Sequence, residues 1–594
     1  MFRFISRTTG AATATAFGLC RSQRRHYIRE EPNGQRIYCS DIPSILPQLE
    51  RETTMYQHIM RSIGGAEQSK PALIQAETGE QYTYAQLPGK IEHVAEVLYG
   101  AGVRRGDVVC IALLNTIAFT PMVMGTLRLG GVVSTVNPVS DAETISHYLA
   151  TNKASVIVGM KFFQKELEGA VNRVMRETNR AVTIIYPEDF MKAASPGPIP
   201  ADYDALSGGA LDDTIYIPFS SGTTGLPKGT QLTNRCLIAN YLQATQFAKT
   251  NSPDHALKSD VSVTVLPLFH IYGFLCCLYT VLASGGTQVV MAKYTLDGFM
   301  EINHKYKATK NCVAPPILLS IVKNFDRFKK HDLSSLRFVT SGAALLDGAL
   351  QEQCEKLIPN CVVGQGYGMT EMSPVVTSPT DNKSMRRTKG SNGRLLPDTE
   401  MRIIKVDASQ QSGADKSAGI DVGKGEEGEI WVRGPQMMKG YLNPEDTAKC
   451  MQDGWYRTGD IGKVDPATEE LFITDRLKEL IKYKGFQVSP ASLEGVILTH
   501  PWVQDCIVIG VPDPKEASFE VPRALVQLRP DLPPKKAVEA TDVIYRFIMA
   551  KEPPHRRLHG GVRVVDQIPK NATGKLMRRV ARQSEIEYLK KNAY

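Results

Sequence analysis

The chain has 594 residues, of which 42% are hydrophobic and 22% charged, and its formal net charge is +8. This length exceeds what a single hydrophobic core supports, so we expect two or more domains. Six arginines precede the first acidic residue, Glu30, and the rest of the chain is nearly neutral. The remainder therefore lacks the basic stripe that binding of nucleic acid requires, and we expect no nucleic-acid partner.

The N-terminal segment, residues 1–29, combines its arginines with Ser, Thr and Ala and contains no acid and no long apolar run. This composition is typical of a mitochondrial presequence rather than of a secretory signal. The sequence therefore predicts a mitochondrial location. The alternative is that these residues are a basic tail on a cytoplasmic enzyme.

Beyond residue 40, short β-branched runs alternate with longer helical stretches, which predicts α/β layers with parallel strands. The predicted strands are 108–114, 156–158, 214–218, 261–266, 287–291, 337–339, 428–434 and 471–474. The segment 405–427 is rich in Ser, Gly, Asp and Lys, which is typical of a mobile surface loop. An apolar strand gives way to a charged segment near Asp475, so we place a large domain at 40–474 and a small α+β domain at 475–594.

The stretch Phe219–Gly229 packs hydroxyls, three glycines and Lys228 into a turn after a predicted strand. Glycines let backbone N–H groups converge on an anion, so this loop predicts phosphate binding. It is not a Walker A loop, because Gly229 stands where that motif has the Ser or Thr that holds magnesium.

Four further segments carry reactive side chains. His270 precedes the longest apolar run, 271–283, which is too short to cross a bilayer and predicts a buried helix. Glu371 follows a glycine-rich stretch, 364–370, and one acid suffices for Mg²⁺ when ligand phosphates supply other oxygens. Asp460 offers a carboxylate suited to the two hydroxyls of a ribose, and Lys575 lies on a turn before a short basic helix.

The eleven cysteines include no Cys-x-x-Cys pair, which indicates neither a zinc site nor a disulfide framework and fits a reducing compartment. The sequence predicts no transmembrane segment and leaves peripheral contact with a membrane open.

Together the order and spacing of these motifs resemble the adenylate-forming superfamily of acyl-CoA synthetases and luciferases. Four segments are most similar in sequence to 4-coumarate:CoA ligases, namely 266–272, 364–371, 433–442 and 475–487. The resemblance covers nearly all of the chain after residue 40. It implies layered α/β subdomains with a small β-barrel-like part, followed by a mobile C-terminal domain.

The resemblance also implies a reaction: a carboxylic acid attacks the α-phosphorus of MgATP, and the resulting acyl-adenylate passes its acyl group to CoA. Lys575 would bridge carboxylate and α-phosphate, His270 would lie near the carboxylate, and Lys478 would be the hinge. Residues implied to bind ATP or AMP are Ser220, Ser221, Gly222, Thr223, Thr224, Gly225, Lys228, Gln365, Gly366, Tyr367, Gly368, Thr370, Asp460, Ile473, Arg476, Lys482 and Gln487. Those implied for CoA are Lys484, Gly485 and, from its distance to His270 alone, Lys293, whereas Glu371 would hold Mg²⁺.

The family pattern lines the acyl pocket with Tyr272, Cys276, Ala343, Gly366, Gly368, Pro374 and Val375. The small glycines and Ala343 leave room for a ring or an acyl chain. The sequence similarity to 4-coumarate:CoA ligases favours an arylpropenoic acid as the substrate, whereas a mitochondrial location favours medium- or long-chain fatty acids. The choice between these acids depends on contacts the size of a methylene group, each about 1 to 3 kcal/mol.

Other functional classes stay open. The acyl acceptor could be a carrier or oxygen instead of CoA, although no Asp-Ser-Leu type carrier segment follows residue 579. A scaffold without turnover conflicts with the intact Lys575 and Glu371, and a phosphotransferase would release ADP. Three departures from the family pattern, at Phe519, 405–427 and 552–557, bear on the surface of the small domain and its contacts with CoA.

Overall fold

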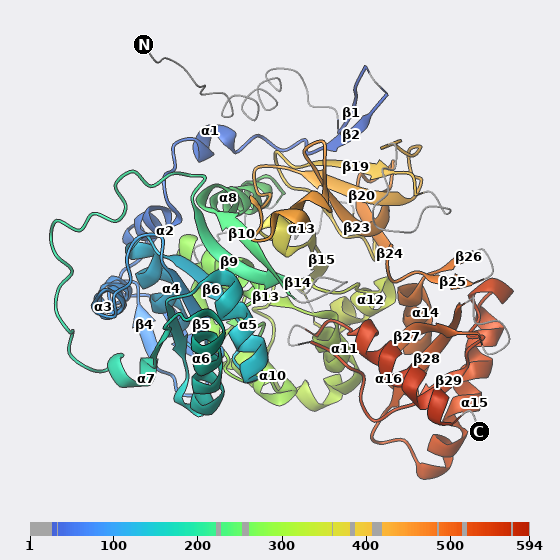
Figure 1. Ribbon diagram of the computed structural model, residues 1–594. Helices are drawn as coiled ribbons and strands as arrows, with labels where there is room; N and C mark the ends of the chain where they lie inside the picture. The colour runs from blue at the N-terminus through green and yellow to red at the C-terminus, as the bar shows by residue number, and fades with distance from the viewer. Residues whose placement is uncertain are drawn as a thin grey trace.

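The computed structural model describes residues 27–592 except 33, 221–226, 252–259, 359, 381–386, 407–418, 484–485, 514–519 and 572–573, with only the backbone of 486 and 487. Figure 1 shows a large α/β body and a small C-terminal part, coloured orange to red, at its side. The predicted α/β class is confirmed.

Two sheets built mainly from parallel strands form the body. The first has the order β15 (Val362–Gln365), β14 (Phe338–Ser341), β13 (Lys310–Val313), β11 (Val261–Thr264), β12 (Thr287–Val290), β3 (Pro71–Gln75) and β4 (Gln81–Thr83). The second has the order β21 (Gly440–Tyr441), β10 (Lys228–Thr233), β9 (Thr214–Ser220), β6 (Val132–Thr135), β5 (Val108–Ala112), β7 (Val156–Gly159) and β8 (Thr183–Ile185). Their central strands are apolar and buried, as strands covered on both faces must be.

A third, antiparallel sheet lies beside these two. Its order is β1 (Ile28–Glu30), β2 (Arg36–Cys39), β19 (Glu400–Ile404), β20 (Gly428–Arg433), β23 (Trp455–Val464) and β22 (Met451–Gln452), and β24 (Leu471–Arg476) pairs with β23. A short sheet joins β16 (Tyr367–Gly368), β17 (Val375–Ser378) and β18 (Arg394–Leu395). Of the predicted loop 405–427, residues 407–418 lie outside the described residues.

Helices cover the sheets of the body (Figure 1). They are α1 (Leu46–Leu49), α2 (Met55–Gly64), α3 (Leu87–Gly100), α4 (Phe119–Arg128), α5 (Ala142–Asn152), α6 (Gln164–Thr178), α7 (Pro187–Phe190), α8 (Asn234–Asn251), α9 (Thr280–Ala283), α10 (Leu296–Tyr306), α11 (Pro315–Asn324), α12 (Gly348–Leu357) and α13 (Pro444–Ala448). Side-chain caps start several of them: Asp141 accepts from Thr144 N before α5, and Asp347 accepts from two backbone N–H groups before α12.

The apolar run 271–283 is helical and buried, as predicted, but most of it is a π-helix, η3 (Tyr272–Tyr279), which continues into α9. Such wide turns are rare and occur often at functional sites. Within the described residues no helix is both long and apolar enough to span a bilayer.

The small part has a hydrophobic core of its own, made of residues between 481 and 589. Its elements are β25 (Ile481–Tyr483), β26 (Phe486–Val488), α14 (Pro490–Leu498), β27 (Val503–Pro512), β28 (Glu520–Leu528), α15 (Pro534–Lys551), β29 (Val562–Val564) and α16 (Arg578–Lys591). The basic helix predicted after Lys575 is therefore present as α16.

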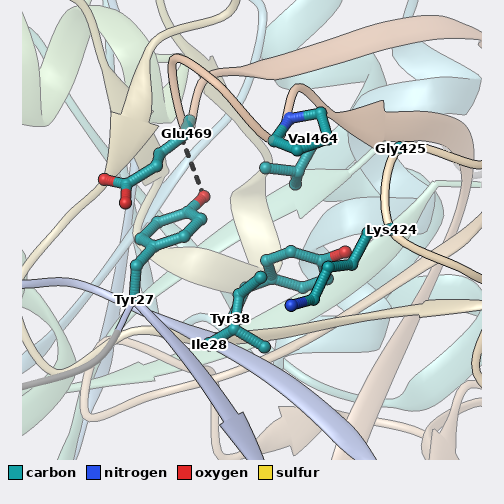
Figure 2. A pocket seen from close by; sticks show the side chains of 8 residues that line it. Tyr27, Ile28, Tyr38, Lys424, Gly425, Val464 and Glu469 are labelled. Atoms are coloured by element: carbon teal, nitrogen blue, oxygen red, sulfur yellow. Dashed lines mark hydrogen bonds between the residues drawn. The ribbon is translucent and has the colours of Figure 1, made fainter.

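The first described residues form a hairpin on the antiparallel sheet. Tyr27 donates its hydroxyl proton to the Glu469 carbonyl at 2.8 Å, and its ring meets Tyr38 edge-on (Figure 2). Both rings, with Lys424 and Glu469, line a cavity of about 250 Å³ that contains no predicted site residue. Because Ile28 and Arg29 belong to β1, the predicted leader boundary at residue 29 overlaps the first strand.

Candidate active site

The predicted phosphate loop is the connection of a β-hairpin. Strands β9 and β10 pair antiparallel on either side of it, with Lys228 opposite Ser220. A strand, loop and second strand differ from the strand, loop and helix of a Walker A motif, which agrees with the sequence. Ser221, Gly222, Thr223, Thr224 and Gly225 lie outside the described residues, whereas the buried Ser220 hydroxyl has no partner among the described ones.

Lys228 points at the end of β21 and at α13. Its ammonium lies 3.1 Å from an Asp446 carboxylate oxygen and 5.2 Å from the centre of the Tyr441 ring. Neither Asp446 nor Tyr441 was predicted as a site residue, although Tyr441 stands in the family-like segment 433–442. A phosphate that reaches Lys228 would compete with Asp446 for this ammonium.

A compact cluster surrounds Asp460, which is 6% exposed on β23. One carboxylate oxygen accepts from the Tyr367 hydroxyl at 2.6 Å, and the other lies 3.1 Å from Arg476 Nε. Asp460 and Arg476 are cross-strand partners of β23 and β24, so the sheet register fixes them as neighbours. The structure thus brings together three of the residues predicted to bind the nucleotide.

Glu371 lies in the short helix η5 (Thr370–Met372) and is 7% exposed. Its carboxylate accepts from the Tyr441 hydroxyl at 2.7 Å, and its backbone carbonyl accepts from Met438 N. The described residues include no group of three or more His, Cys, Asp or Glu side chains that could hold a metal. A single fixed carboxylate fits Mg²⁺ only if a ligand's phosphates and water supply the other oxygens.

Lys575 lies on a turn of the small part. Asn571 holds the turn from both directions, because its side-chain oxygen accepts from Lys575 N and its backbone N–H donates to Lys575 O. A Cβ atom on Gly574 would come within 3.7 Å of Ala314 and Pro316, so the turn packs against the start of α11. The left-handed backbone of Gly574, with φ of 82°, permits this approach.

Burial lowers the pKa of Lys575 to about 8, assisted by the nearby Arg476, while Glu479, Asp460 and Glu371 act in the opposite direction. Burial, with a smaller effect of Lys575, also lowers the pKa of His270 to about 4. Lys575 therefore shares one electrostatic environment with His270 and the Asp460 cluster. Residues more than a hundred positions apart meet where the two parts of the chain touch.

Of the predicted acyl-pocket residues, Tyr272, Cys276 and Ala343 lie at or beside η3. Tyr272 donates to the Thr340 carbonyl at 3.1 Å, and its ring would lie 3.0 Å from a Cβ atom on Gly342. The next residue, Ala343, has φ of 70°, a left-handed conformation that is unfavourable for a residue with a side chain and often marks functional sites. Cys276 lies on the same π-helix as Tyr272.

The other predicted acyl-pocket residues lie beside or on β16 and β17 and in the turn between them. A Cβ atom on Gly368 would collide with the Pro374 carbonyl, and one on Gly366 would lie 3.1 Å from the Thr377 carbonyl. These glycines bring the strand that carries Tyr367 close to Pro374 and Val375.

Several predicted nucleotide residues are held by their surroundings. The Gln365 side-chain oxygen accepts from Leu346 N, and its buried amide nitrogen has no partner among the described residues. Thr370 is 7% exposed, and Ile473 N donates to Asn392 at 2.8 Å.

The remaining predicted residues are not gathered into this cluster. Lys482, exposed on β25, pairs across the hairpin with Gln487, and Lys293 is exposed beyond β12. Burial, and then the nearby Lys228, lowers the pKa of Lys478. Lys484 and Gly485 lie outside the described residues.

Comparison with protein families matches residues 63–442 to the family "AMP-binding enzyme" and residues 492–575 to "AMP-binding enzyme C-terminal domain". The second match ends at Lys575. The matched ranges together span the β9–β10 hairpin, η5, the start of η3 and the turn that carries Lys575.

Among curated relatives, 4-coumarate–CoA ligase 3 of Oryza sativa subsp. japonica is 35% identical over 91% of this chain and 94% of its own length. 4-Coumarate–CoA ligase 3 of Arabidopsis thaliana is 34% identical over 93% and 94%. Among solved structures, o-succinylbenzoate CoA synthetase of Bacillus subtilis, in complex with its acyl-adenylate intermediate, is 25% identical with a TM-score of 0.71, covering 88% of this chain and 97% of that one.

Proposed function

The chain belongs to the AMP-binding enzyme family and is an AMP-forming CoA ligase, and from this premise we propose that it activates an arylpropenoic acid through an acyl-adenylate. The observation that carries the proposal is the position of Lys575. This lysine, delivered by the small part, shares an environment with His270, Arg476, Asp460 and Glu371 of the body.

In the proposed first half-reaction, a carboxylate oxygen of the acid attacks the α-phosphorus of ATP and pyrophosphate leaves. Two anions must approach, so a cation between them lowers the barrier by offsetting charge in the transition state. Lys575 supplies this cation. Asp460 accepts from the ribose hydroxyls, and Ser220 and Lys228 hold the outer phosphates together with the glycine-rich loop.

His270 is uncharged near neutral pH because of its low pKa. A neutral imidazole can position a carboxylate by one hydrogen bond without holding it as an ion pair, which would hinder attack. His270 Nδ1 faces Tyr272 N at 3.4 Å, which leaves Nε2 for the substrate.

Mg²⁺ bound with ATP would be held on the protein side by Glu371. When bound, the ion neutralises phosphate charge and polarises the phosphoryl oxygens. Tyr441, which donates to Glu371, orients this carboxylate.

In the proposed second half-reaction, the CoA thiol attacks the acyl carbonyl and AMP leaves with its carboxylate-derived oxygen. Lys482 and Gln487 lie on the β25–β26 hairpin, directly after Lys478. Rotation about Lys478 would withdraw Lys575 and bring this hairpin, with Lys484 and Gly485, to the CoA arm. Lys293 would contact CoA phosphates.

Similarity to 4-coumarate–CoA ligases over nearly the full chain supports an arylpropenoic acid as the substrate. Straight-chain fatty acids remain a second candidate, supported by the presequence-like composition of the first residues. We propose a mitochondrial location for the same reason, with the leader ending before Tyr27, because Tyr27 and β1 belong to the sheet.

The test is to incubate the protein, beginning at Tyr27, with MgATP, CoA and a pool of arylpropenoic and straight-chain acids, and to identify products by mass spectrometry. We expect AMP and the thioester of an arylpropenoic acid. Enrichment of a fatty acyl-CoA would reassign the substrate. Acyl-adenylate without thioester would indicate a different acceptor, and ADP would contradict the reaction.

A further inference from the structure

Lys228, which the proposed function assigns to the outer phosphates of ATP, is already paired with an acid of the body. Its ammonium lies 3.1 Å from a carboxylate oxygen of Asp446 in α13, and the two side chains are only 22% and 20% exposed. The same ammonium lies 5.2 Å from the centre of the Tyr441 ring. Salt and water screen a partly buried pair less than an exposed one, so Asp446 is a strong competitor for Lys228.

Backbone pairing fixes Asp446 beside the lysine. Lys228 begins β10, which pairs with β21, and Leu442 N donates to the carbonyl of the next residue, Gly229, at 2.8 Å. A Cβ atom on Gly229 would lie 2.5 Å from the Leu442 side chain, so the glycine allows this close approach. Helix α13 begins two residues later, at Pro444. The strands therefore bring the acid to the lysine, and the pair is not a chance contact between two long side chains on the surface.

Asp446 has a second cation within reach. Lys449, three residues further along the chain, places its ammonium 3.6 Å from the same carboxylate and is 65% exposed. A carboxylate that keeps one cation and contact with water is not left as an isolated charge, so Asp446 can release Lys228 at little cost. A phosphate group carries about 1.5 to 2 negative charges near neutral pH, against one for the carboxylate. An incoming outer phosphate therefore displaces Asp446 from Lys228, and Asp446 recovers the ammonium when that phosphate leaves.

We propose that Asp446 is a positioning residue that acts through Lys228 and sets how tightly the site holds outer phosphates. The inference rests on the proposed function, in which those phosphates belong to ATP before adenylation and to pyrophosphate after it. Both ligands must displace the Asp446 carboxylate, so both bind more weakly by the same factor. AMP has no outer phosphate and is unaffected. Asp446 thus weakens ATP binding and speeds the release of pyrophosphate, the first product.

The experiment titrates the full chain calorimetrically with ATP, pyrophosphate and AMP, each with Mg²⁺, and compares the wild type with Asp446→Asn. This variant keeps the shape of the side chain and removes its charge. We expect ATP and pyrophosphate to bind the variant about twofold to fivefold more tightly, the effect of removing one partly exposed ion pair, and AMP to bind both proteins equally. Unchanged or weaker binding of ATP, or an equal gain for AMP, overturns the inference.

Two further variants separate this role from a general effect of charge. Glu445→Gln is the matched control, because Glu445 is the exposed neighbour of Asp446 on α13 and, within the described part of the chain, Lys228 pairs with Asp446 instead. It should bind all three ligands as the wild type does. In Lys228→Gln, the additional change Asp446→Asn should leave ATP affinity unaltered, because the interaction that it removes is already absent. A gain in ATP affinity in either case overturns the inference.

Kinetics give a second readout that a purely structural role would not produce. In Asp446→Asn, KM for ATP and the concentration of pyrophosphate that half-inhibits acyl-CoA formation should both fall, whereas damage to the fold would raise KM. Asp446→Glu, which restores the charge, should return both toward the wild-type values. If Asp446→Asn does not fold, Asp446→Ser takes its place in each measurement. Wild-type protein that binds none of the three ligands contradicts the proposed function as well, whereas equal affinities in wild type and variant overturn this inference alone.

Discussion

The Asp460 cluster and the Lys575 turn are built in opposite ways. Asp460 and Arg476 lie on the paired strands β23 and β24 of the body and form an ion pair, and Tyr367 on β16 donates a hydrogen bond to Asp460. Lys575 belongs to the small C-terminal part, which has a separate hydrophobic core, and it reaches the same site across the contact between that part and the body.

The difference assigns different tasks to the two regions. Side chains fixed by sheet register need no rearrangement to receive a nucleotide, so they serve binding. A residue carried by a separate part can be present in one half-reaction and absent in the other. Changes in the first region should therefore weaken ATP binding, and changes in the second should slow adenylation after ATP is bound.

The largest expected effect is that of Lys575→Ala. Loss of a cation that stabilises transition-state charge should lower the rate of acyl-adenylate formation by about 10²- to 10³-fold. Affinity for ATP, measured by calorimetry, should stay almost unchanged. Lys570→Ala is the matched control, because Lys570 lies in the same turn and pairs with Asp505 within the small part. Undiminished pyrophosphate exchange in Lys575→Ala would refute the assigned role.

Asp460→Asn should have the next largest effect. It leaves Arg476 without its carboxylate partner and replaces one of the two acceptor oxygens proposed for the ribose hydroxyls with an N–H donor, at a cost of roughly 1–3 kcal/mol in ATP binding. Calorimetric titration with ATP measures this loss. The proposed division of tasks requires KM for ATP to rise more than kcat falls, and the reverse pattern would contradict it.

Some residues of the site could be predicted from the sequence, and others could not. The motifs located Asp460, Glu371 and Lys575 because each stands in a recognisable local pattern, and β9, β11 and β20 followed from β-branched runs. Asp446 and Tyr441 were missed, because their contacts with Lys228 and Glu371 exist only after β21 pairs with β10. The leader, 1–29, stays a prediction, and composition could not record that residue 28 within it pairs with residue 38.

Adenylation should depend on pH through Lys575. Its pKa of about 8 lies below the ordinary value of 10.5, so the required ammonium is lost as pH rises through about 8. The rate of pyrophosphate exchange should then fall about tenfold per pH unit. Between these two values the unfolded chain binds more protons than the folded one, so this group alone makes the free energy of unfolding increase with pH. In Lys575→Arg the fall in activity should occur at a higher pH. A fall at the same pH as in the wild type would exclude Lys575 as the group that titrates.

The smallest expected effect is that of Lys323→Ala. The Lys323 ammonium donates to the carbonyls of Val503 and Gln504, at 2.6 and 3.1 Å, and so links α11 to the small part. Loss of these hydrogen bonds should raise the activation free energy of adenylation by about 0.5–1.5 kcal/mol, which slows the reaction severalfold, and should leave the affinity for ATP intact. Lys329→Ala is the control, because the partner of Lys329 among the described residues is Asp326, on the same side of the contact. Equal behaviour of the two variants would show that this contact does not place Lys575.

The central claim is that a carboxylate oxygen attacks the α-phosphorus of ATP. Supplying the acid with both carboxylate oxygens isotopically heavy, together with MgATP and CoA, tests it most directly. We predict that the AMP released carries one heavy oxygen on its phosphate and that the acyl-CoA carries the other. AMP without the label, or the label in inorganic phosphate beside ADP, would contradict the account.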